Sequence, residues 1–312
     1  MQTISLKTVK DCDSIFSNGS DVLLGGKNLW LFRADGTFVA KHTTIRNPSK
    51  AIFLPHNTVL VDGHGDGSYH YISLIDGEIL WSSIKKGRKT SISVDRFAVS
   101  SDGMIVYDVY HGTSNDLYVN RIIPQQQKHD YYIIKDGLRV THDVYCDEND
   151  SLCVLQSHLL VGCGDTPKRQ NGILSISINQ DQVTYNWKRW WQSNPEAFTS
   201  ACGCDGKKIL CLDFSVYDLE SKKKYTFLDS TELSTLPKDH FGWLYDDKRK
   251  LLTIYFVVEK QNIVIDCQNG NIIARYTRED QSVGYQGCPV GDEFWTGTRK
   301  GISRLPFPNV GI

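Results

Sequence analysis

The sequence predicts an all-β fold assembled from one repeated unit of four short antiparallel strands. The clearest copy spans residues 51–84, where AIFLPH, VLVDG, YHYISLI and EILWSSI are rich in β-branched and aromatic residues and are bounded by Gly, Asp, Asn or Ser. An Asp-Gly pair, Asp76-Gly77, separates the last two strands, as is typical of a tight hairpin turn. Seven copies at a period of about 45 residues indicate a seven-bladed β-propeller of four-stranded blades, with residues 1–312 as a single domain.

The other copies follow the same order, and the strands of each blade are named A to D here. Blade 1 is predicted at residues 14–18, 22–26, 29–34 and 37–42, and blade 3 at 96–100, 104–110, 116–123 and 130–135. Blade 4 is predicted at 142–146, 152–162, 173–178 and 183–190, and blade 5 at 197–203, 207–213, 214–219 and 223–228. Blade 6 is predicted at 241–246, 251–258, 262–267 and 271–277. Only a short segment around residues 230–236 favours a helix.

Blade 7 has sequence for three strands only, at residues 284–290, 293–298 and 301–307. Residues 3–9, TISLKTV, precede the first A strand and belong to no blade, so they are the candidate for the missing D strand. Pairing this N-terminal strand with the last blade closes the ring and removes an exposed sheet edge. Two packed β-sandwiches are the alternative fold, but they do not explain why the turn recurs in register.

Three segments carry a resemblance to known repeats: LIDGEILW at 74–81, IDCQNGNIIARY at 265–276 and FRADGTFVAKH at 32–42. They resemble the repeats of quinoprotein-like and WD40-like propellers, in which an Asp, a Gly turn and a following hydrophobic residue or Trp recur in each blade. The resemblance covers nearly the whole chain, although the Trp-Asp dipeptide is absent and only Trp81 stands at the docking-tryptophan position. It implies a fold and no single function, since propellers serve as scaffolds, inhibitors, hydrolases and oxidoreductases.

The amino-acid composition of the chain limits the classes of binding partner that we expect. The formal net charge is −1, with 35 basic and 36 acidic side chains, so there is no global field that attracts nucleic acid or an anionic membrane. The N-terminus has no secretory signal pattern, and the longest apolar run, residues 251–258, is too short to span a bilayer as a helix. The nine cysteines are an odd number and indicate reduced thiols. We therefore expect a cytoplasmic, monomeric protein with no membrane partner and no nucleic acid.

The stretch VDGHGDGS places Asp62, His64 and Asp66 at alternate positions, as in a metal-binding loop. As a calcium loop it is incomplete, because Ser73 stands at the twelfth position where a bidentate Glu is required. We interpret it as a hairpin with a loose tip, at which substitutions leave stability almost unchanged, and predict no metal and no cofactor.

Six cysteines fall in blades 4 and 5: Cys146, Cys153, Cys163, Cys202, Cys204 and Cys211. Cys202 and Cys204 are spaced too closely for a paired zinc motif, so core packing is favoured over a redox-sensitive pair. No Gly-x-Ser-x-Gly elbow is present, and no catalytic residue is predicted. The alternative is a propeller hydrolase or lactonase with a divalent cation in the axial channel, for which Asp143, Glu196, Asp239 and His240 are candidates.

The segment NWKRWWQSNPE, residues 186–196, combines three tryptophans with Lys and Arg, which are residue types of interface hot spots. Its structural alternative is that Trp187 and Trp190 close strand D against a neighbouring blade. In a four-stranded blade, B–C loops and D–A connections emerge at one end, so this segment and the loop predicted at 162–172 share a face. The hypothesis is a non-catalytic scaffold, in one form an inhibitor or immunity-type protein, that binds a protein partner there. The predicted contact residues are Lys168, Arg169, Arg189, Trp190, Trp191, His64, Asp66, His111 and Asp165.

Overall fold

The computed structural model describes the following part of the chain: residues 9, 12–86, 91–93, 96–112, 116–135, 139–160, 168–179, 182–189, 201–204, 208–211, 215–218, 221, 223–226, 228–236, 241–246, 249–256, 258–277, 287–298 and 301–308. These residues form seven antiparallel sheets, and in six of them the strands pair in chain order. The chain divides into two compact units, Met1–Ser82 with Phe227–Ile312, and Ser83–Thr226. The boundary between the units falls inside one strand, so a single domain stays a prediction.

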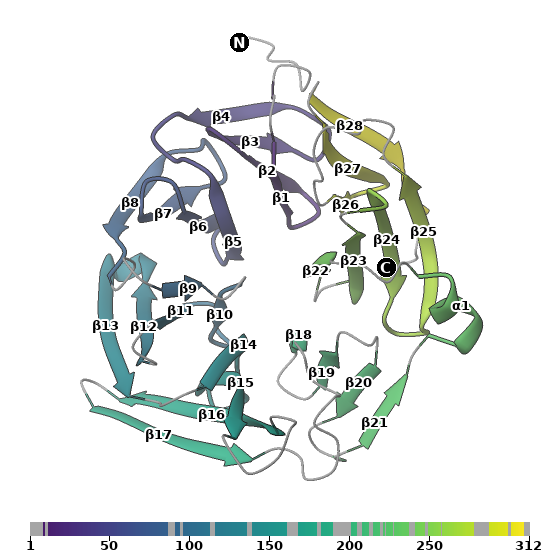
Figure 1. The fold of residues 1–312 in the computed structure, drawn as a ribbon. Helices are drawn as coiled ribbons and strands as arrows, with labels where there is room; N and C mark the ends of the chain where they lie inside the picture. The colour runs from purple at the N-terminus through teal and green to yellow at the C-terminus, as the bar shows by residue number, and fades with distance from the viewer. Residues whose placement is uncertain are drawn as a thin grey trace. The chain divides into compact units, whose positions relative to one another are not determined.

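The first unit contains blades 1, 2, 6 and 7 (Figure 1). Blade 1 consists of β1 (Ser14–Ser17), β2 (Asp21–Gly25), β3 (Leu29–Arg33) and β4 (Phe38–His42), and blade 2 of β5 (Pro48–Leu54), β6 (Thr58–Gly63), β7 (Ser68–Ser73) and β8 (Ile79–Ile84), of which the last two residues belong to the second unit. Blade 6 consists of β22 (Phe241–Asp246), β23 (Leu251–Phe256), β24 (Gln261–Asp266) and β25 (Asn271–Thr277). Blade 7 consists of β26 (Cys288–Val290), β27 (Glu293–Thr298) and β28 (Gly301–Pro306).

The second unit contains blades 3, 4 and 5. Blade 3 consists of β9 (Ser91–Ser93), β10 (Ala98–Val99), β11 (Val106–Gly112), β12 (Asp116–Ile123) and β13 (Lys128–Lys135), with the 3-10 turn η3 (Pro124–Gln126) between the last two. Blade 4 consists of β14 (Arg139–Cys146), β15 (Leu152–Leu160), β16 (Lys168–Asn179) and β17 (Gln182–Arg189). Blade 5 consists of β18 (Ala201–Cys204), β19 (Lys208–Cys211), β20 (Ser215–Asp218) and β21 (Lys223–Thr226).

The four-strand unit predicted from sequence is thus confirmed, with one local difference. The A strand of blade 3 has two segments, because β9 pairs with Tyr110–Gly112 and β10 with Val106–Tyr107 of the same partner β11. The predicted helical turn is α1 (Ser230–Ser234), whose first turn is capped by the Asp229 carboxylate accepting from the Glu232 N–H. The predicted closing strand, residues 3–9, lies outside the described residues except for Val9, which is buried.

The Asp-Gly turns adopt the geometry that their sequence requires. Asp35, Asp76 and Asp102 each accept a hydrogen bond from the backbone N–H two residues later, and Asn269 does the same through its amide oxygen. The glycine that follows each of them has a positive φ, between 73° and 93°. Only glycine adopts this conformation without steric cost, which is why the pair recurs in register. The corresponding pair Asp205-Gly206 lies outside the described residues.

The core lies between neighbouring sheets, so the second strand of a blade is covered on both faces. All residues of β2, β6 and β23 are buried. The last strand of blade 2, β8, alternates between half-buried and exposed residues. One cluster joins blades 1 and 2 and another joins blades 3 and 4, where Trp187 packs as the structural alternative for that residue expects. Among the described residues, no helix has the length and hydropathy needed to cross a bilayer.

Blades 1 and 7 pack against each other although they lie at opposite ends of the chain (Figure 1). Val9, Cys12 and Ile15 share one buried cluster with Cys288, Val290 and Trp295, and Trp295 is fully buried. The Arg304 guanidinium pairs with Glu293 at 2.5 Å and donates to the Asp35 carbonyl of blade 1 at 3.3 Å. The two ends are therefore joined by apolar and polar contacts.

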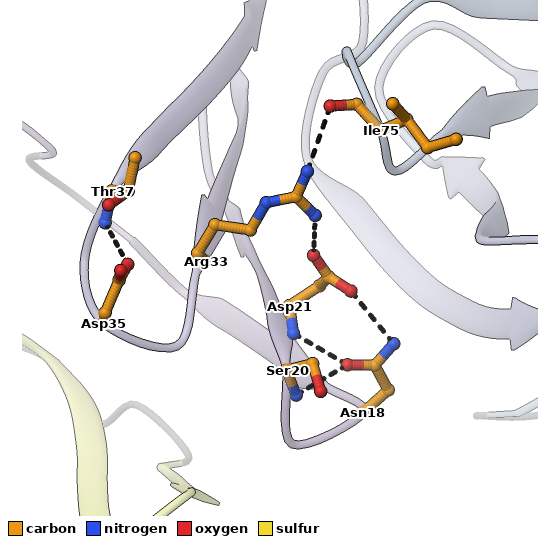
Figure 2. A network of polar contacts seen from close by, with 7 residues as sticks. All are labelled: Asn18, Ser20, Asp21, Arg33, Asp35, Thr37 and Ile75. Atoms are coloured by element: carbon orange, nitrogen blue, oxygen red, sulfur yellow. Dashed lines mark hydrogen bonds and ion pairs between the residues drawn. The ribbon is translucent and has the colours of Figure 1, made fainter.

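A second arginine links blades 1 and 2 (Figure 2). The Arg33 guanidinium pairs with the Asp21 carboxylate and donates to the Ile75 carbonyl at 3.0 Å. Asp21 is itself held by Asn18, whose amide nitrogen donates to the carboxylate at 3.3 Å and whose oxygen accepts from the Asp21 N–H at 2.7 Å. Arg33 thus anchors the C–D turn of blade 2 to the end of β3.

Candidate functional site

The B–C loop of blade 2 is bonded to the connection that precedes the blade. The N–H groups of His64 and Gly65 donate to the carbonyls of Asn47 and Arg46, at 3.2 and 2.8 Å. The Asn47 N–H in turn donates to the Gly26 carbonyl of the blade 1 loop at 2.7 Å. Three chain segments at this end of blades 1 and 2 are thereby tied together through their backbones.

The Asp66 carboxylate is the centre of this loop. It accepts from the Arg46 N–H at 2.9 Å and from the Ser68 N–H at 3.0 Å, and its Oδ1 lies 3.0 Å from Nε2 of His70. A Cβ at Gly63 would lie 2.3 Å from the Asp66 Oδ2 atom, so glycine at 63 leaves the space that the carboxylate occupies. The interpretation as a loose tip is wrong, because Asp66 fixes the tip on both sides.

His70 continues the hydrogen-bond chain to the outer strand of the blade. Its Nδ1 atom lies 2.9 Å from Oγ of Ser82 in β8, and the residue is 7% exposed. A carboxylate only accepts hydrogen bonds, so Nε2 of His70 carries a proton and donates to Asp66. In the neutral imidazole, Nδ1 then accepts from the Ser82 hydroxyl.

His42, at the end of β4, lies beside this chain. Burial lowers the pKa of His42 below its ordinary value, and the neighbouring His70 imidazole lowers it further. Its Nε2 atom is buried without a hydrogen-bond partner. A neutral His42 fits this environment, since a protonated ring would leave a buried charge.

Asp62 and His64 of the same motif, and the predicted contact residue His111, have different surroundings. Asp62 is 1% exposed, and its Oδ2 lies 4.0 Å from Nζ of the equally buried Lys50. His64 is exposed at the loop surface. His111 lies in β11 opposite Leu117, half-buried, with its Nε2 atom enclosed and without a partner. Of the predicted contact residues in these loops, His64 and Asp66 are both exposed, but the Asp66 carboxylate is engaged in hydrogen bonds within the blade.

The predicted B–C loop at 162–172 of blade 4 is shorter than expected, which corrects the sequence analysis. Strand β16 begins at Lys168, and the residues Lys168 and Arg169 pair with Leu160 and Leu159 of β15. The reason is that KRQN continues the ladder of a long strand pair. Asp165 and the rest of the connection, 161–167, lie outside the described residues.

These two strands extend beyond their neighbours as a ribbon. Strand β14 starts at Arg139, opposite His158, and β17 ends at Arg189, opposite Gly172. The pairs Leu159–Arg169 and Leu160–Lys168 therefore lie past both flanking strands in the described chain. Lys168 is four residues from Gly172, about 13 Å along the strand at ~3.3 Å per residue. The structure thus brings Lys168, Arg169 and Arg189 to one end of blade 4, whereas Trp190 and Trp191 lie outside the described residues.

Metal and thiol chemistry gain no support from the described residues. Within this part of the chain, no group of three or more His, Cys, Asp or Glu side chains could hold a metal ion. Asp143, a candidate for the channel cation, is 1% exposed and pairs with Nε of Arg96 at 3.2 Å. Glu196, Asp239 and His240 lie outside the described residues.

The cysteines with described side chains are free. Cys153 is buried, and burial raises the pKa of its thiol to about 11. Burial also raises the pKa of Cys146 well above its ordinary value. A thiol with a raised pKa is a poor nucleophile, which agrees with core packing for these two residues. Nothing described concerns Cys163 or the side chains of Cys202, Cys204 and Cys211.

The sequence analysis missed the chain from Ser82 to Asp66, because it did not connect His70 with either residue. A signal was present: Asp66 and His70 are four residues apart on either side of a strand start, and Ser82 lies in the next strand. What sequence could not show is that the carboxylate turns back toward β7 and away from solvent.

Solved structures similar to this chain are β-propellers. A streptogramin B lyase structure superposes with a TM-score of 0.59 at 10% identity, covering 96% of this chain and 95% of that one. The WD40 β-propeller domain of Doa1 superposes with a TM-score of 0.58 at 10% identity, covering 95% and 92%. No protein-family model and no curated protein sequence matches the chain. The chain therefore has a β-propeller fold of the WD40-like and quinoprotein-like type, and the similarity at this identity extends to the fold alone.

Proposed function

We propose that this propeller is a binding module that recognises a protein partner through the B–C end of its blades. The observation that carries the proposal is the β15–β16 ribbon, which extends past both flanking strands and has Lys168 and Arg169 in its outermost described pairs. Binding residues commonly lie on segments that extend beyond a rigid sheet.

The chemistry of the ribbon indicates how it would bind. Lys168, Arg169 and, near its base, Arg189 are cationic, and arginine is enriched in interface hot spots. Complementary acidic groups on a partner would increase the association rate despite the near-zero net charge of the whole chain. Within the first unit, the loop around Asp66 is a separate candidate for contact, since its tip is fixed before any partner arrives.

Site-specific photo-crosslinking in the source cell tests this proposal. A photoreactive amino acid at position 169 should capture a defined partner, and the same group at position 128, where β13 begins at the C–D end, should not. Lys168→Ala/Arg169→Ala should then reduce binding of the captured protein at least tenfold, since hot-spot truncations cost about 2 kcal/mol or more. The matched control is Lys128→Ala/Lys223→Ala, which removes the same charge from the starts of β13 and β21. Identical captured proteins from positions 169 and 128 would overturn the assignment.

A further inference from the structure

Strand β8 carries two consecutive serines, each bonded to a histidine. Ser82 and Ser83 point to opposite faces of the strand because side chains alternate. Ser82 is exposed, and its Oγ lies 2.9 Å from Nδ1 of His70. Ser83 is half-buried, and its Oγ lies 2.8 Å from Nδ1 of His129. In both pairs a serine Oγ lies within hydrogen-bond distance of Nδ1 of a histidine, so the two serines can be compared within one protein.

The third member of each chain differs in charge. Nε2 of His70 lies 3.0 Å from a carboxylate oxygen of Asp66, whereas Nε2 of His129 lies 2.8 Å from the amide oxygen of Asn120. When a histidine takes a proton from serine, a carboxylate on its far side stabilises the imidazolium that forms, and an amide does so much less. Burial also lowers the pKa of His129 to about 4, which makes it a weak base. Only the Ser82 chain has the members of an activated nucleophile.

The Ser82 chain is also fixed in orientation. The Asp66 carboxylate is held by two backbone N–H groups, those of Arg46 and Ser68, so it presents one oxygen to His70 without side-chain rearrangement. Leu80, two residues from Ser82 and on the same face of β8, is a large apolar side chain that is 41% exposed. The hydroxyl therefore lies at the surface beside an apolar group, and a substrate can approach it without a conformational change.

We propose that Ser82 is a nucleophilic acyl acceptor for esters and thioesters with an apolar acyl group, with His70 as its general base. The Ser82 Oγ attacks the acyl carbonyl carbon while its proton passes to Nδ1 of His70. The bond from that carbon to the alcohol or thiol then breaks, and the departing group takes the proton from His70. The products are an acyl ester on Ser82 and the free alcohol or thiol, so no oxidant or further reactant is needed. Asp66 acts as a positioning residue, through His70. This reactivity goes beyond partner binding and involves a different unit of the chain from the β15–β16 ribbon.

Two probes test the proposal. A fluorophosphonate ester should add one phosphonyl group to the protein with loss of fluoride, located at Ser82 by peptide mass spectrometry. p-Nitrophenyl acetate should release one equivalent of p-nitrophenolate as Ser82 becomes acetylated. Ser82→Ala should abolish both reactions, and Ser83→Ala, the matched control from the same strand, should leave both unchanged. His70→Gln should slow them by about 100-fold, the lower range for loss of a general base.

The positioning role of Asp66 is tested by the effect of D2O on the labelling rate and by the rate of an Asp66 variant. With the parent protein, labelling should slow in D2O because a proton moves from Ser82 to His70 during attack. Asp66→Asn should reduce the rate at least tenfold while thermal unfolding shows a folded protein. This isotope measurement uses the parent chain, so it decides the matter even where a variant does not fold. Labelling spread over several hydroxyl groups, an equal rate in Ser82→Ala, or no D2O effect would each overturn the proposal.

Discussion

Nε2 of His70 lies 3.0 Å from Oδ1 of Asp66, and this contact connects the tip of the β6–β7 hairpin to the strand that follows it. The same carboxylate bonds backbone N–H groups on both sides of the tip. The loop is consequently an ordered part of blade 2, held by one acidic side chain together with backbone hydrogen bonds.

Asp66→Ala should therefore destabilise the protein by about 1 kcal/mol, the usual net contribution of hydrogen bonds, because the two backbone N–H groups it releases are exposed and can bond to water. Asp66→Asn keeps an acceptor oxygen and should cost less. Urea unfolding monitored by fluorescence measures both differences. His64→Ala, at an exposed site of the same loop, should stay within about 0.5 kcal/mol of the parent. Equal stability of Asp66→Ala and His64→Ala would contradict the structural role of the carboxylate.

The turn glycine Gly77 is required for two separate reasons. Its φ is +79°, and a Cβ there would lie 2.2 Å from the Cβ of Ala40 in β4. Gly77→Ala should cost about 1–2 kcal/mol for the left-handed backbone and more for the displaced strand. Gly291 has φ +57° with nothing within 4 Å of the added Cβ, so Gly291→Ala should show the backbone cost alone. Comparing the melting temperatures of the two variants separates the backbone cost from the cost of the displaced strand. A smaller fall in melting temperature for Gly77→Ala than for Gly291→Ala would refute this account.

Arg33 should stabilise the fold through the planar shape of its guanidinium group as well as through its charge. It pairs with Asp21 and donates to the Ile75 carbonyl, and its side chain is 36% exposed. Arg33→Ala should cost about 1 kcal/mol, and less in high salt, because solvent screens a partly exposed ion pair. Arg33→Lys keeps the charge but lacks the planar fork, so it should recover only part of the loss. Chemical denaturation with urea at low and high salt distinguishes these outcomes; full recovery by lysine would argue against the bond to Ile75.

His129 should make stability depend on pH on the acidic side of neutrality. Burial is the main cause that lowers its pKa in the folded protein to about 4, against about 6.5 in an unfolded chain. The unfolded state thus binds the proton first, so this contribution is complete above about pH 6.5 and is lost as pH falls toward 4. The melting temperature of His129→Gln should change less than that of the parent across this window. The control is His56→Gln, at an exposed turn residue, which should retain the parental slope.

Much of the fold could be predicted from sequence because its signals are local. Strand composition and Asp-Gly turns specify hairpins through neighbouring residues, and β22 and β25 have the predicted bounds. β9 was missed because three residues, SIS, are too few to show alternation. The length of β16 was underestimated because Lys168–Asn171 is polar and has no strand signal apart from its partner β15.

Contacts within the candidate site and between blades were harder to predict from the sequence. The bond from Arg304 to the Asp35 carbonyl joins residues 269 positions apart, and nothing local in the sequence marks either one as its partner. The Ser82–His70–Asp66 chain involves nearer residues, but it depends on which way each side chain turns. For Lys168, Arg169 and Arg189, strand order accounts for their places at one end of blade 4, and a shared binding surface stays a prediction.

The packing of Ile15 and Phe32 against Trp295 and Cys288 has a consequence for biosynthesis. A ribosome that adds about 5–20 residues per second needs tens of seconds to progress from the first blade to the last. During that interval the apolar surface of β1–β3 that Trp295 later covers is still open to water and to other chains. Blade 1 can form its hairpins early, but its final burial waits for the last strands to leave the exit tunnel. Nascent chains stalled before residue 288 should therefore recruit holding chaperones more strongly than the completed protein does.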